Sequence, residues 1–168
     1  LPGFGTRTVD NTQNLAVGFT RTFGSRTFND LRLGWNRLHH DVFPDNTGVD
    51  GFGRLDMTGP SLGPDDLGYP AITMTGYDQV GDDVSLPVVR STGTLHLTDT
   101  VSLERGRHYI KAGGEFRHYR SDGFNHLFSR GQLNFQGAYT GNALADLLLG
   151  LPTVTLLANN DNPQALRT

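Results

Sequence analysis

Histidine and acidic side chains are the groups in this sequence whose chemistry would suit metal binding. The chain has six histidines, and two of them, His39 and His40, are adjacent. Adjacent side chains of an extended segment point to opposite faces, so these two imidazoles cannot readily bind one ion. The acidic pairs at 65–66 and 82–83 lie among Gly and Pro residues and lack the spacing of a calcium-binding loop. We therefore predict no metal site and no bound cofactor.

The sequence also contains no recognisable catalytic nucleophile. The chain contains no cysteine, which excludes thiolate metal sites, disulfides and cysteine nucleophiles. Serine, histidine and aspartate are present, but without a G-x-S-x-G turn or another activated nucleophile. We expect that the protein is not an enzyme. The formal net charge of −3, with basic residues scattered rather than clustered, also predicts no nucleic-acid partner.

The elements that must carry these side chains are long β-strands. Residues 90–104 and 107–120 form two alternating arms around a short polar link, and residues 14–23 and 26–40 form a second such pair. The longer arms exceed the roughly 9–11 residues that a tilted strand needs to cross a bilayer. Long hairpins with one apolar face, one polar face and minimal turns are typical of outer-membrane β-barrels.

The alternation divides these arms into two faces. The apolar face is predicted to meet lipid or to form an aromatic girdle, and we assign to it Leu31, Leu33, Trp35, Leu95, Leu97, Ile110 and Phe116, with Phe135 from a later strand. The polar face is predicted to line a lumen, and we assign to it Arg32, Asn36, Lys111, Glu115 and Arg117. Charges there are expected to hydrate or brace the wall rather than to contact a ligand directly.

The segment 41–87 holds five of the eight prolines and has no sustained period, apart from a short candidate strand at 71–75. Such a connection is expected on the outer side of a barrel, where loops are long, whereas periplasmic turns are short. The alternative is a disordered linker between two soluble domains. A second outer loop is predicted at 121–130, and the strand at 131–139 is then expected to return to the periplasmic side.

A helical turn is predicted at 142–150, because Asn142 can cap a helix, the Ala/Leu run favours it, and Gly150 ends it. We expect this turn on the periplasmic side, followed by a strand at 153–158. The fold prediction for residues 1–168 is therefore all-β. It is an antiparallel up-and-down meander of about six long strands, an open segment of a transmembrane β-barrel cut from a longer chain. No run of about 18 apolar residues is present, which excludes a transmembrane helix.

Three motifs also carry a family resemblance. The segment 28–37, F-N-D-L-R-L-G-W-N-R, resembles the N-E-L-R-x-G-Y-N-R strand of Oar-like TonB-dependent receptors, outer-membrane proteins that often carry a carboxypeptidase-regulatory-like N-terminal domain. The segment 105–117, R-G-R-H-Y-I-K-A-G-G-E-F-R, is similar to their R-G-K-H-x-x-K-x-G-G-E-x-R hairpin. The block from 131 to 152, with T-G at 140–141 and A-D-L-L-L-G-L-P at 145–152, resembles their G-x-F-x-F … T-G … A-D-F-L-L-G-x-P block.

The resemblance implies a barrel of about 22 strands with a plugged lumen, energised by the TonB complex through a plug region outside this chain. It further implies a bacterial outer-membrane location, contact with outer-membrane lipid, and uptake of a ligand that the sequence does not identify. The second hypothesis, from a different class, is a soluble all-β binding or adhesion module that recognises carbohydrate. A β-rich hydrolase ranks last, because no catalytic constellation is present.

Overall fold

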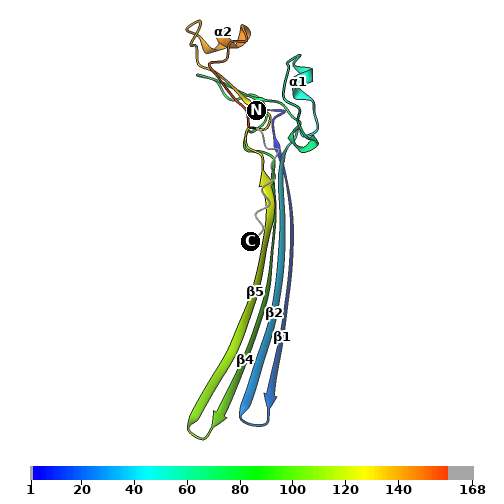
Figure 1. The fold of residues 1–168 in the computed structure, drawn as a ribbon, viewed down its shortest axis with the longest axis vertical. Helices are drawn as coiled ribbons and strands as arrows, with labels where there is room; N and C mark the ends of the chain where they lie inside the picture. Colours follow the sequence, from blue (N-terminus) through cyan, green and yellow to red (C-terminus); the bar gives the residue numbers. More distant parts are fainter. Residues whose placement is uncertain (1, 159–168) are drawn as a thin grey trace. The chain divides into compact units, whose positions relative to one another are not determined.

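The computed structural model describes residues 2–158, and its main feature is a sheet of four long strands. Each strand has 18 residues, and the sheet order is β1-β2-β4-β5 (Figure 1). The bounds are β1 Thr6–Phe23, β2 Thr27–Pro44, β4 Val88–Arg105 and β5 His108–Asn125. Strands β1 and β5 are the two edges, so the sheet is open. This confirms the predicted fold class, a long antiparallel meander that forms an open barrel segment.

Tight turns join the strands of each hairpin. Gly24 and Gly106 adopt φ values of +63° and +62°, a backbone region that glycine enters without the steric cost met by other residues. The amide N–H of Glu104 donates to the carbonyl of Arg26 over 2.8 Å, so the two turns lie at the same end of the sheet, as predicted. The opposite ends of the strands extend beyond the predicted bounds. The residues there lack a clear apolar alternation, so the sequence pattern did not predict them as strand.

The described chain divides into two compact units. The strand unit comprises residues 10–39 and 90–122, which are the greater part of the four long strands. The loop unit comprises residues 2–9, 40–89 and 123–158.

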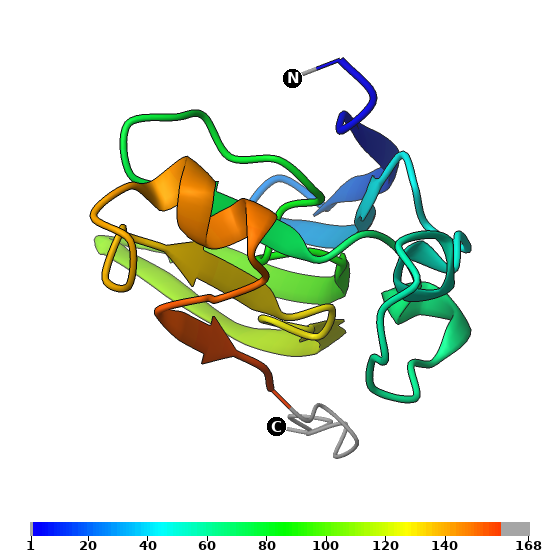
Figure 2. The ribbon, with the colours of Figure 1, turned by 90° about the horizontal axis from the view of Figure 1, so that it is seen from above.

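The loop unit contains a small sheet of its own (Figure 2). Its strand order is β3-β6-β7, with β3 parallel to β6 and β6 antiparallel to β7. Helix α2 contacts β3 and β6, and the buried apolar residues of this unit include Ala71, Leu86, Phe135 and Ala143. The elements of this unit are α1 Gly51–Arg54, the 3-10 helix η1 Pro64–Asp66, β3 Ala71–Met74, β6 Gln132–Phe135, α2 Ala143–Leu148 and β7 Val154–Leu156.

Two elements of the predicted meander are corrected by this small sheet. The strand expected at 131–139 is only β6, and it pairs with β3 of the long connection instead of extending the four-stranded sheet. The strand expected at 153–158 is only β7, which pairs with β6. The physical reason is local, since Gly137 and Gly141 take positive φ values that turn the chain away from an extended path soon after Phe135.

The helical turn at 142–150 is confirmed, with Asn142 as its N-cap and Gly150 at φ +67° after its end. Helix α2 belongs to the loop unit and contacts β3, and its place on the periplasmic side stays a prediction. Within residues 2–158, neither helix has the length and apolar character needed to span a membrane.

Candidate functional site

The long strands of the strand unit carry apolar side chains on one face of the sheet. Apart from Leu33, which is half-buried, its large side chains remain 36–56% exposed, which is unusual for hydrophobic groups on several neighbouring strands. Seven of the eight predicted apolar residues lie on these strands, together with further members of the same alternation, Leu15, Val17, Phe19 and Val101. A shallow hollow on this face is lined by Leu97, Val101, Ala112 and Phe116, which shows that residues of β4 and β5 share one surface.

The eighth predicted residue, Phe135, lies elsewhere. It is 3% exposed and belongs to β6 of the small sheet. Its assignment to a lipid-facing surface of the long sheet is therefore corrected. Its burial follows from the parallel pairing of β6 with β3, which places Phe135 opposite Met74.

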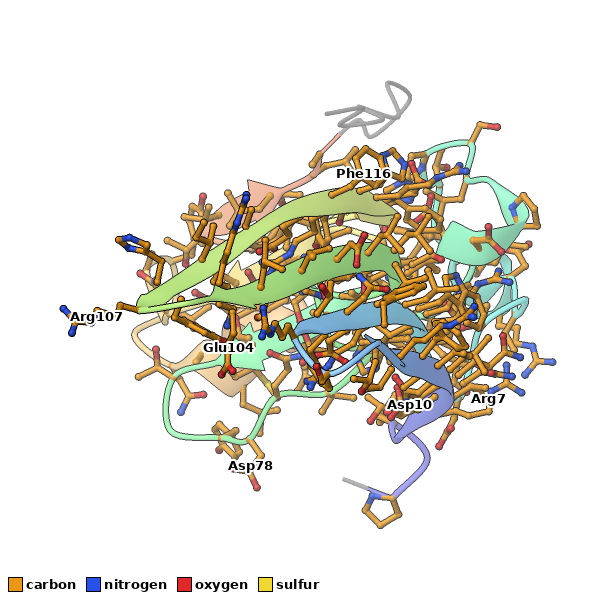
Figure 3. The ribbon with its side chains drawn as sticks, turned by 90° about the horizontal axis from the view of Figure 1, so that it is seen from below. Arg7, Asp10, Asp78, Glu104, Arg107 and Phe116 are labelled. Atoms are coloured by element: carbon orange, nitrogen blue, oxygen red, sulfur yellow. The ribbon has the colours of Figure 1, made fainter. Side chains whose placement is uncertain are left out.

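The opposite face of the long sheet is polar. Figure 3 shows Phe116 projecting from one side of the sheet, and Glu104 and Asp10 from the other. On this polar face the carboxylate of Glu115 accepts from Arg117 and lies 2.9 Å from Nε2 of His96 on the neighbouring strand. Because these are exposed contacts, we attribute to them at most small effects on stability.

The five predicted lumen residues all fall on this polar face. Arg32 pairs with Asp30 over 2.9 Å, and Asp30 also accepts from the hydroxyl of Thr20 on β1. Asn36 and Arg117 line one open hollow of about 790 Å³. Lys111 occupies the same alternation of β5 as Glu115 and Arg117. The structure thus brings these residues onto one surface, which is the arrangement needed for a hydrated wall.

One polar pair interrupts the apolar face. The side-chain amide of Asn29 donates to the carboxylate of Asp99 over 2.5 Å, and also to the carbonyl of Thr100. Asp99 lines the same hollow as Leu97 and Phe116. The amide partner offsets part of the cost of placing a carboxylate among apolar side chains. Sequence alternation marks Asp99 as an exception but does not identify its partner on another strand.

Arg130 holds the loop unit together. It is 3% exposed, and its guanidinium donates to the carbonyls of Asp66 and Asp83, at 3.4 and 3.2 Å, and to that of Leu86. Burial lowers the pKa of Arg130 from its ordinary value, while the nearby carboxylates of Asp82, Asp66 and Asp83 oppose that shift. The side chain therefore acts as a clamp between the segment at 126–131 and the long connection.

The carboxylates around this clamp have partners of their own. Asp82 is 2% exposed and accepts from the amide of Tyr69, at 2.8 Å, and from Asn46, at 2.9 Å. Both oxygens of Asp66 lie 2.9 Å from Nδ1 of His126. A Cβ added at Gly68 would lie 2.5 Å from Oδ2 of Asp82, so only glycine allows this close approach. The sequence indicated these acidic residues only as rejected calcium ligands, and no pattern in it predicted the clamp.

The turn before helix α2 is organised around Asp146, whose side chain is fully buried. Its carboxylate accepts from the amide and hydroxyl of Thr140, at 2.9 and 2.7 Å, and from the amide of Tyr139 at 3.3 Å. Burial alone would raise the pKa of Asp146, but these hydrogen bonds outweigh it and hold the pKa below its ordinary value. Asn142 caps the helix by accepting from the amides of Leu144 and Ala145.

The histidine side chains lie in different parts of the fold. Within residues 2–158, no group of three or more His, Asp or Glu side chains is arranged to hold a metal ion. His39 and His40 belong to β2, whereas His126 is paired with Asp66 in the loop unit.

Comparison with known proteins agrees with the two-faced sheet. A family model described as an outer membrane beta barrel domain matches residues 1–168, the whole chain. No curated protein matches the sequence. Strands with one apolar face and one polar face are typical of outer-membrane barrels. The chain belongs to the outer-membrane β-barrel family, and its place is the bacterial outer membrane.

Proposed function

We propose that the chain forms part of the wall of a TonB-dependent receptor, similar to the Oar-like receptors, that takes up a ligand across the outer membrane. The supporting observation is where the three resembling motifs lie. The segment 28–37 lies in the N-terminal part of β2, and 105–117 covers the end of β4, the turn and the first half of β5. The block 131–152 covers β6 and α2. Each motif thus corresponds to a defined element of the fold.

The proposal includes an orientation. The two hairpin turns are short, and the connection from β2 to β4 is long. Short turns characterise the periplasmic side of outer-membrane barrels, and long loops the exterior. The turns at Gly24 and Gly106 therefore face the periplasm, and the long connection between β2 and β4 faces the outside. A ligand would first meet the connections that Arg130 clamps.

The partner of uptake would be the TonB complex, acting through a plug region of the receptor. The chain described here contributes wall and outer loops to this process. Its polar face supplies a hydrated inner surface, on which the pairs of Glu115 with His96 and Arg117 brace neighbouring positions. No enzymatic step is part of the proposal.

The test is uptake by cells that express the full reading frame containing this chain, in hosts with and without functional TonB. Compounds removed from a complex medium are measured by mass spectrometry. We expect at least one compound to be depleted only when both the receptor and TonB are present. Depletion that persists without TonB would contradict the proposal. Recovery of the protein in the soluble fraction without detergent would instead support the carbohydrate-binding alternative.

A further inference from the structure

The apolar face of the long sheet ends abruptly at Trp35, the single tryptophan of the chain. Alternate residues of a strand share a face, so the next side chain on this face of β2 is Arg37. On β5 the same alternation leads from Phe116 to His118 and then to Arg120. The surface therefore changes from apolar to basic within a few residues of Trp35 on two strands.

These side chains line a hollow of about 420 Å³ in the strand unit. Its lining includes Trp35, Arg37, Leu95, His118, Arg120 and Asp122. Arg120 contacts Asp122 through Nε, yet its side chain remains 76% exposed. The hollow is thus bordered by the guanidinium groups of Arg37 and Arg120 and by the aromatic and aliphatic side chains of Trp35 and Leu95.

The position of this hollow along the membrane normal follows from the strand geometry. The apolar stretch of β4 from Leu103 to Leu95 covers eight residue steps, or about 27 Å along the strand. A tilt of about 40° reduces this to about 20 Å along the membrane normal, close to the roughly 25 Å apolar band of such barrels. Trp35 then lies at the outer edge of the band, where tryptophan is enriched. Arg37 lies about 5 Å farther out, among the lipid headgroups.

We propose that this hollow binds the phosphate headgroup of a lipid in the outer leaflet. Arginine presents a planar fork of donors that matches phosphate oxygens, and the apolar band below it accommodates the acyl chains. Charge complementarity and the adjoining Trp35 and Leu95 favour a lipid phosphate over free phosphate in water. The inference rests on the apolar face meeting lipid and on the orientation given under the proposed function, and it does not depend on TonB-driven uptake.

The single tryptophan provides the test. The full chain is reconstituted into vesicles, and the fluorescence of Trp35 is quenched by lipids with brominated acyl chains. Brominated phosphatidic acid is compared with brominated phosphatidylcholine at equal mole fraction. We expect a clear preference for the phosphatidic acid, which falls roughly fivefold for each of the substitutions Arg37→Gln and Arg120→Gln. The matched control removes two charges from the polar face, with Arg32→Gln and Arg117→Gln, and should retain the preference.

The outcomes separate the possibilities. Equal quenching by both lipids would overturn the phosphate site while leaving the apolar face toward lipid. No quenching by either lipid would overturn the site together with the orientation of the face on which it rests. Loss of the preference when inorganic phosphate is added at millimolar concentration would show an anion site without lipid selectivity and would also contradict the proposal. None of these results depends on uptake by cells.

Discussion

Replacing Arg130 with methionine should open the loop unit locally while leaving the long sheet intact. The substitution keeps most of the apolar stem but removes the guanidinium that donates to the carbonyls of Asp66, Asp83 and Leu86. It also leaves Asp82, which is 2% exposed, without the nearby positive charge. The loss therefore combines unpaired acceptors with an uncompensated buried carboxylate.

The magnitude can be bounded from these contacts. A hydrogen bond to a charged group contributes about 1.5–3 kcal/mol, and breaking a buried charged network costs about 3–5 kcal/mol in total because the individual penalties overlap. The lower end, about 3 kcal/mol, corresponds to roughly 100-fold more frequent local opening. Arg130→Lys retains the charge but not the planar fork, so its effect should be intermediate.

Hydrogen exchange measured by mass spectrometry on the membrane-inserted protein provides the assay. Peptides covering 66–87 and 126–135 should exchange about 100-fold faster in Arg130→Met than in the parent protein. Peptides from the long strands should be unaffected. Arg54→Met serves as the control, because Arg54 is an exposed arginine of the same unit. Equal exchange in the Arg130 and Arg54 variants would refute the clamp.

Three further predictions concern smaller features. Asn142→Ala removes the cap of α2, and the first amides of that helix should exchange about fivefold faster, as expected for a loss of about 1 kcal/mol. The folded-state pKa of Asp146 lies below its ordinary value. Its contribution to the stability of the turn before α2 is therefore complete above about pH 4 and is lost as the pH falls through the lowered pKa. Asp146→Asn should abolish this pH dependence of amide protection in the turn before α2. Asn29→Leu should destabilise the membrane-inserted sheet in urea titrations. The double variant with Asp99→Leu should be as stable as the parent protein or more stable. Additive effects of the two substitutions would contradict the pairing.

The long strands were the part of the fold that the sequence predicted best. Their period of two persists over many residues, and the hairpin turns carry glycines at the positions that need positive φ. Every predicted apolar residue on these strands, from Leu31 to Phe116, belongs to the expected alternation. The pattern is strong because a wall between lipid and water imposes opposite requirements on its two faces.

The small sheet was not predictable in the same way. Strand β6 has four residues, and its partner β3 lies about sixty residues earlier in the chain, so no local pattern specifies their parallel pairing. The burial of Phe135 follows from that pairing. For Arg130, no periodicity distinguishes a buried arginine from a solvated one, because its acceptors are backbone carbonyls of a distant segment. The helix α2 was predictable, since its cap and stop signals are local.

The central claim is that the apolar face of the long sheet meets lipid and the polar face meets water. Because the chain has no cysteine, single nitroxide labels can be placed without background at Leu33 and Leu97 on one face and at Arg32 and Thr98 on the other. In vesicles, we predict that collisions with oxygen dominate at the first pair and collisions with a water-soluble nickel chelate at the second. Equal accessibility of the two faces, or the reverse pattern, would contradict the account.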